Sequence, residues 1–192
     1  MTQSGWVGEG PAPAGPSFRE WAEAHRVQRV ASSAYSQASG TKGGWRMDLG
    51  ELSGRWRGTW RTWVEPDKLH SESLIDATVE VLFGGKAGLL RYTAELDGHV
   101  DGCALIGVTQ DESVVDWLDT WHTSGLVMSM RGPKPAGGRI EGTTTYSAGD
   151  DDWRWSIEVG LDGDRLVIRH YNEGPEIPRY LGVEALMDRV TD

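Results

Sequence analysis

The chain is poor in cysteine and in long apolar segments. Its 192 residues include one cysteine, Cys103, so no internal disulfide bond can form and a reducing compartment is expected. No apolar run approaches the roughly 18 residues that a membrane-spanning helix needs. The first residues lack a basic stretch followed by an apolar one, the pattern of a signal peptide. We therefore expect a cytoplasmic protein without membrane contact.

Basic residues are scarce relative to acidic ones. The chain carries 29 Asp and Glu against 19 Lys and Arg, a formal net charge of −10. Such an excess repels phosphate groups, so nucleic acid is not expected as a partner. The five histidines show neither i, i+4 nor His-x-His spacing, and Cys103 has no second thiol nearby. We expect no metal site and no cofactor.

Alternating residue types predict strands in most of the chain. Between residues 54 and 63, arginines alternate with uncharged residues, namely Trp56, Gly58, Trp60 and Thr62. Because successive side chains of a strand point to opposite faces, one face is aromatic and the other charged. Similar runs predict ten strands, near residues 54–64, 73–83, 88–97, 99–108, 113–120, 124–131, 138–147, 153–160, 164–172 and 180–190.

Short turn signals between these runs favour an antiparallel meander. Asp97-Gly98 and Asp162-Gly163 are typical two-residue hairpin turns. Closing the sheet removes its exposed edges, so we predict an all-β fold, a roughly ten-stranded antiparallel up-and-down β-barrel. A two-sheet sandwich is the structural alternative.

The N-terminal part differs from the rest in composition. Residues 1–16 are rich in glycine and proline and predict a flexible arm. Residues 17–45 predict a helix and linker, with Ser17 and Glu20 at capping-box spacing. The barrel is expected to occupy residues 46–192. The helix could cover a barrel mouth as a lid or form the contact of a homodimer.

The strand pattern selects side chains for the barrel interior. Ten tryptophans stand against two phenylalanines, and indole suits the wall of a binding cavity. Trp121 and Leu126 are also expected to face inwards. The predicted ligand-binding residues are Trp56, Trp60, Tyr92, Trp117, Asp119, Met128, Tyr146, Trp155 and His170.

Three groups of residues resemble the DUF1579 family. They are Gly54-x-Trp56-x-Gly58 with Trp63-x-Glu65-Pro66; Ile106-Gly107 with Trp117-Leu118-Asp119-Thr120; and Val167–Asn172 with Leu181–Glu184 and Arg189. The resemblance covers roughly residues 50–190 and implies a lipocalin-like barrel of the calycin type, without a settled activity. The family's usual Gly-Tyr-Asp turn is replaced after Gly107 by Val108-Thr109-Gln110, so its tyrosine contact is missing.

Two functions fit such a barrel. The preferred one is binding of a small hydrophobic or aromatic molecule inside the barrel. The alternative is a small enzyme, an isomerase or cyclase of specialised metabolism. In it Asp119 or a tyrosine would be the catalytic acid or base, because burial raises the pKa of a carboxyl group. The expected neighbours of Asp119 are Tyr92, His122, Tyr146 and Arg169. The competing reading of Asp119 is structural: a buried carboxylate bonded to a tryptophan N–H or a backbone amide.

Two further readings concern the contents of the barrel. The nitrobindins, a related barrel family, bind haem through a histidine late in the chain, and His170 has a comparable position. A structural or surface histidine is the competing reading, and the rest of the nitrobindin pattern is absent. The tryptophans could also fill the barrel completely, which would make it purely structural.

Overall fold

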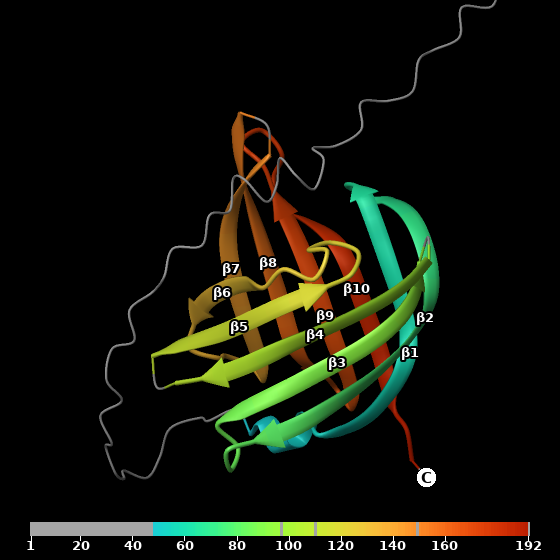
Figure 1. The fold of residues 1–192 in the computed structure, drawn as a ribbon, viewed down its shortest axis with the longest axis vertical. Coiled ribbons are helices and arrows are strands. Elements are labelled where there is room, and N and C mark those ends of the chain that lie inside the picture. Colours follow the sequence, from blue (N-terminus) through green and yellow to red (C-terminus); the bar gives the residue numbers. More distant parts are fainter. Residues whose placement is uncertain (1–47, 97, 110, 149, 192) are drawn as a thin grey trace, which may run out of the picture.

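The computed structural model describes residues 48–191 except 97, 110 and 149 (Figure 1). The predicted arm and N-terminal helix lie outside the described residues. One short 3₁₀ helix, η1 (Leu49–Leu52), precedes the first strand. Among the described residues no helix is long and apolar enough to cross a membrane.

Ten antiparallel strands close into a barrel, in which each strand pairs with its neighbours in sequence and β1 pairs with β10. The predicted up-and-down barrel is therefore confirmed. The strands are β1 (Gly54–Glu65), β2 (Lys68–Leu82), β3 (Ala87–Leu96), β4 (Gly98–Val108), β5 (Glu112–Asp119), β6 (Met128–Pro133), β7 (Arg139–Ala148), β8 (Asp151–Asp162), β9 (Arg165–Glu173) and β10 (Tyr180–Arg189).

Two strand boundaries differ from the prediction by more than two residues. β2 begins at Lys68, five residues earlier than expected, and β6 begins only at Met128. The chain leaves the sheet after Asp119 and forms a loop over residues 120–127. Trp121 and Leu126 belong to this loop and are 40% and 38% exposed, so the prediction that they face inwards was wrong. The alternation of a strand does not continue into a loop.

Arg57 and Arg61 of β1 point outwards and meet carboxylates on β2. Arg57 lies opposite Asp76 and Arg61 opposite Glu72, each with a nitrogen–oxygen distance of 2.7 Å. Arg169 of β9 is less exposed and pairs with Glu158 and Glu184. Charge alternation in the sequence thus reflects cross-strand ion pairs on the outer surface.

The opposite faces of the strands form one continuous apolar core. Trp56, Trp60 and Trp117 are among its largest fully buried side chains. At the end where the chain enters β1, Leu49 and Leu52 of η1 are buried, and Trp56 Nε1 donates to Leu52 O at 2.9 Å. The helix η1 therefore covers the lower end of the barrel, and the upper mouth is the end at which the odd-numbered strands finish (Figure 1).

Candidate functional site

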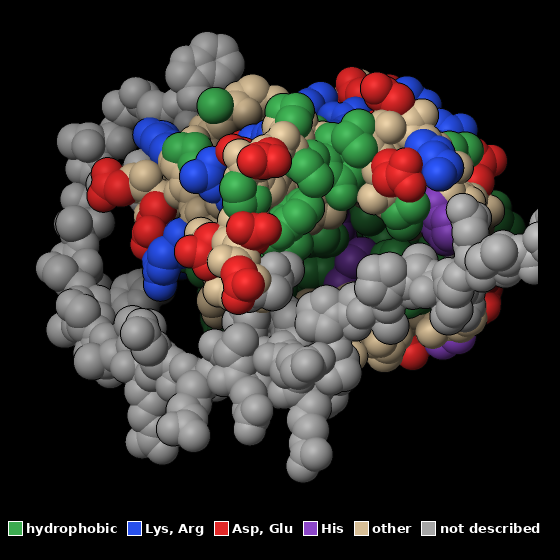
Figure 2. Space-filling model, turned by 90° about the horizontal axis from the view of Figure 1, so that it is seen from above, with side chains coloured by type: hydrophobic (Ala, Val, Ile, Leu, Met, Phe, Trp, Pro, Cys, Tyr) green, Lys and Arg blue, Asp and Glu red, His purple; other side chains and the backbone are tan. Residues whose placement is uncertain are grey.

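Six ring side chains pack together inside the barrel, and we call them the aromatic cluster: Trp60, Tyr92, Trp117, His122, Trp155 and His170. They come from β1, β3, β5, the 120–127 loop, β8 and β9. His170 is central, with ring-centroid distances of 4.9 Å to Trp117 and 5.5 Å to both Trp155 and His122. Figure 2 looks down on the barrel and shows hydrophobic and histidine side chains within a recess.

Asp119 organises the loop that carries His122 into this cluster. Its Oδ1 accepts hydrogen bonds from the backbone N–H groups of Trp121, His122 and Thr123, at 2.5–3.2 Å. Its Oδ2 accepts from Tyr92 Oη at 3.1 Å and lies 2.6 Å from His122 Nδ1. Five donors therefore converge on one buried carboxylate, which fixes the start of the loop.

The electrostatics of Asp119 differ from the sequence expectation. Burial alone raises the pKa of Asp119, but the hydrogen bonds and charge of His122, with those of the backbone amides, outweigh it and leave this pKa below its ordinary value. Burial, followed by the charge of Asp119, raises the pKa of Tyr92 well above its ordinary value. At neutral pH Asp119 is therefore ionised and Tyr92 protonated, and neither has the pKa of a ready acid–base group.

His170 is held in the neutral form. It is 1% exposed, and burial, followed by the charge of His122, lowers the pKa of His170 to about 3. Its Nδ1 has no hydrogen-bond partner, and the same holds for Nε1 of Trp60 and of Trp155. All three are buried atoms of the aromatic cluster. The cluster therefore contains hydrogen-bonding capacity that the described residues do not use.

The remaining predicted site residues lie elsewhere. Trp56 is near the lower end, with the guanidinium of Arg189 4.1 Å from its ring centroid. Met128 is half-buried against the core. Tyr146 is half-buried, donates a long 3.4 Å hydrogen bond to Asn172 Oδ1, and burial raises its pKa to about 12. Of the neighbours expected for Asp119, Tyr92 and His122 contact it, whereas Arg169 points outwards.

Two site residues were not anticipated. Thr123 exchanges hydrogen bonds with the backbone of Asp119, at 2.9 Å in both directions. An Asp followed four residues later by Thr is a local signal that could have suggested this turn. Asn172 lies between Tyr146 and Tyr180, and nothing in its sequence context points to that position.

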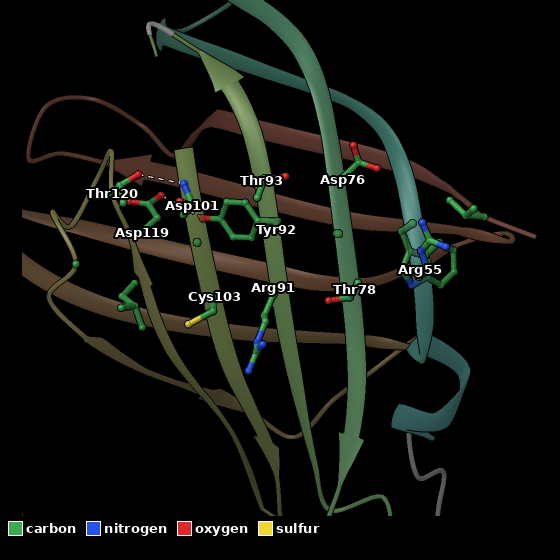
Figure 3. A pocket seen from close by; sticks show the side chains of 16 residues that line it. Arg55, Asp76, Thr78, Arg91, Tyr92, Thr93, Asp101, Cys103, Asp119 and Thr120 are labelled. Atoms are coloured by element: carbon green, nitrogen blue, oxygen red, sulfur yellow. Dashed lines mark hydrogen bonds between the residues drawn. The ribbon is translucent and has the colours of Figure 1, made fainter. Parts of the chain in front are cut away.

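A groove of about 700 Å³ crosses β1–β5 (Figure 3). Most of its labelled side chains, such as Arg55, Thr78 and Arg91, are exposed and alternate along their strands with buried residues. The groove therefore follows the outer side of the sheet, away from most of the aromatic cluster. Tyr92 and Asp119 border both regions, and Figure 3 shows the Tyr92 ring directed towards Asp119.

We expect Gly102→Ala to disturb the Tyr92–Asp119 contact. A Cβ at Gly102 would overlap with Cζ of Tyr92, so the buried ring must move. We expect a loss of about 2–3 kcal/mol in the free energy of unfolding, typical of overpacking. Gly107→Ala on the same strand is the control, because its nearest atom is 3.9 Å away. Equal stability of both variants in urea unfolding would contradict the tight contact.

Metal ligands do not gather in the part of the chain that the structure describes: it contains no group of three or more His, Cys, Asp or Glu side chains placed to hold an ion. His99 lies between Glu95 and Asp101, but all three are exposed.

The chain matches no protein-family model and none of the curated proteins. Its fold is similar to the crystal structure of Rv2717c from M. tuberculosis, with a TM-score of 0.52 and 14% sequence identity. The similarity covers 74% of this chain and 95% of that chain. At this identity it shows the fold alone, so the resemblance to DUF1579 stays a prediction. What the comparison shows is that this chain shares the β-barrel fold of Rv2717c.

Proposed function

We propose that the barrel binds a small aromatic or otherwise hydrophobic molecule at the aromatic cluster. The observation that carries this proposal is the set of three buried nitrogens without partners, Trp60 Nε1, Trp155 Nε1 and His170 Nδ1. Each buried polar atom left unpaired costs about 1–3 kcal/mol. A ligand that supplies the missing partners would recover part of this cost on binding.

The surroundings of these nitrogens suit such a ligand. Small-molecule sites are mostly apolar and aromatic, with a few polar groups that fix orientation. Trp117 and Trp155 stack with ring centroids 5.9 Å apart and planes inclined by 7°. Trp155 is half-buried and His122 is 12% exposed, so both lie within reach of solvent. Leu126 and Val127 add exposed apolar surface on the neighbouring loop.

An acid–base enzyme is the competing proposal. It needs a carboxyl or phenol group whose pKa lies near the working pH. The pKa of Asp119 is lowered and both of its oxygens are occupied, while the pKa of Tyr92 is raised. These properties suit a positioning role for Asp119 and favour binding over proton transfer.

Haem is a second candidate ligand, because His170 offers a neutral imidazole. A neutral ring nitrogen is the form that ligates a metal, and the pKa of His170 lies at about 3. Against this fit, Trp60, Trp117, His122 and Trp155 all have ring centroids within 5.9 Å of His170. A porphyrin could reach the imidazole only after some of these rings had moved.

Naphthalene is expected to bind and to quench tryptophan fluorescence, because three tryptophans belong to the aromatic cluster. Trp155→Ala should weaken this binding about tenfold, since a lost aromatic contact is worth about 1.5 kcal/mol. Leu74→Ala, on the outer face of β2, is the matched control and should bind as the wild type does. The titration is followed by fluorescence and by native mass spectrometry.

Two results would argue against the proposal. Binding that is equally strong in Trp155→Ala would locate the ligand elsewhere, and no binding at all would point to a completely filled barrel. Protein purified from its own host should also be examined by visible absorbance, since a haem band would favour the second candidate.

A further inference from the structure

We infer that the ligand of the aromatic cluster is an uncharged, planar aromatic molecule that carries hydrogen-bond-accepting oxygens. This inference rests on the proposed function and specifies the chemical class of the ligand. It follows from the three unpaired nitrogens, from the absence of charge on His170 and from the planar shape of the surrounding rings.

The unpaired indoles demand an acceptor. An indole N–H only donates, so Trp60 and Trp155 each need an acceptor atom with a lone pair, which an oxygen of a ligand would supply. Two other buried indoles of this barrel are satisfied within the protein: Trp56 donates to Leu52 O and Trp117 to Tyr92 Oη, both at 2.9 Å. The fold can therefore pair a buried indole, and the two unpaired ones stand out by contrast.

His170 joins the two indoles in one small region. Its ring centroid lies 5.9 Å from that of Trp60 and 5.5 Å from that of Trp155, in edge-to-face contacts. A neutral imidazole carries one proton that can reside on either nitrogen, so Nδ1 can donate or accept. Because both indoles contact the His170 ring, one small planar ligand can pair with all three atoms by displacing one of these rings.

The charges around the cluster exclude an ionised ligand. The groups facing His170 are His122 and Asp119, and the carboxylate of Asp119 would repel a ligand anion. Arg169, the sequence neighbour of His170, points outwards to Glu158 and Glu184. A ligand cation finds both carboxylate oxygens of Asp119 already occupied by five donors. An uncharged molecule avoids both difficulties.

Three bicyclic probes of similar shape test the ligand class. Chromone has a carbonyl and an ether oxygen, naphthalene has no acceptor, and chromone-2-carboxylate adds a negative charge. Chromone should bind about tenfold to a hundredfold more tightly than naphthalene, as expected for one or two added hydrogen bonds. Chromone-2-carboxylate should bind at least tenfold more weakly than chromone. Affinities are measured by tryptophan fluorescence and confirmed by calorimetry.

Two variants separate hydrogen bonding from ring contact. Trp60→Phe and Trp155→Phe keep an aromatic ring but remove the N–H, so each should reduce the preference for chromone over naphthalene by about fivefold to tenfold. Trp56→Phe is the matched control, because its N–H is already bonded to Leu52 O and should not influence the preference.

The outcomes distinguish this inference from the proposed function. If chromone and naphthalene bind equally well, the barrel binds aromatic molecules but the acceptor requirement is wrong. If chromone-2-carboxylate binds most tightly, the ligand is not uncharged. If none of the three probes binds, the proposed function itself fails. The inference would also be overturned if Trp60→Phe and Trp155→Phe left the preference for chromone over naphthalene unchanged.

Discussion

Replacing Asp119 by alanine is expected to lower the free energy of unfolding by about 3–5 kcal/mol. The side chain is completely buried, and its carboxylate accepts from three backbone N–H groups, from Tyr92 and from His122. Alanine leaves all five donors without an acceptor in a region of low water access. Urea-induced unfolding, followed by tryptophan fluorescence, measures the loss.

Two variants control this experiment. Asp116 is half-buried on β5, and its position in the strand places it on the face opposite to that of Asp119. Asp116→Ala should therefore alter the free energy of unfolding by no more than about 0.5 kcal/mol. Asp119→Asn keeps one oxygen for the three backbone donors but places an amide nitrogen near His122, so its cost should be intermediate. If Asp119→Ala were as stable as Asp116→Ala, the carboxylate would not hold the 120–127 loop.

The barrel itself could be predicted because its inner and outer faces differ in residue type. Trp56 and Trp60 alternate with arginines on β1. In the structure the two tryptophans are buried, and the arginines lie on the outer face. The start of β2 was missed because residues 68–72 are mostly polar on both faces. That segment pairs with the end of β1 through backbone hydrogen bonds, which leave no trace in residue type.

The candidate site was predictable only in part. Strand parity correctly predicted that Trp117 and Asp119 face inwards, and both residues are 1% exposed. The lowered pKa of Asp119 was not foreseen, because the His122 side chain and the backbone amides of Trp121–Thr123 become its partners only when the chain turns after β5. Parity also treats Trp56 and Trp60 alike, although only one of them finds an acceptor for its N–H. Hydrogen-bond satisfaction depends on three-dimensional neighbours, so sequence patterns do not report it.

Stability is expected to fall as the pH drops below about 6.5, the ordinary pKa of histidine, because His170 resists protonation. The pKa of His170 in the folded protein is about 3, lowered mainly by burial and then by the charge of His122. Between these two values the unfolded chain binds a proton that the folded chain does not. Stability therefore rises with pH in this window, and acidification removes about 1.4 kcal/mol per pH unit, or about 2 kcal/mol by pH 5.

His170→Phe should flatten this pH dependence, because phenylalanine has no proton to bind in either state. The comparison uses the slope of unfolding free energy against pH, so a change in absolute stability from the larger ring does not affect it.

His99→Gln is the control. The hydrogen bonds and charges of Glu95 and Asp101 raise the pKa of His99, so the loss of His99 should not flatten the slope of stability against pH on the acid side. Below about pH 4 both His170→Phe and the wild type should still lose stability, because the lowered pKa of Asp119 stabilises the fold only while its carboxylate is ionised. An unchanged slope between pH 6.5 and 5 in His170→Phe would mean that the buried imidazole takes up its proton in the folded barrel.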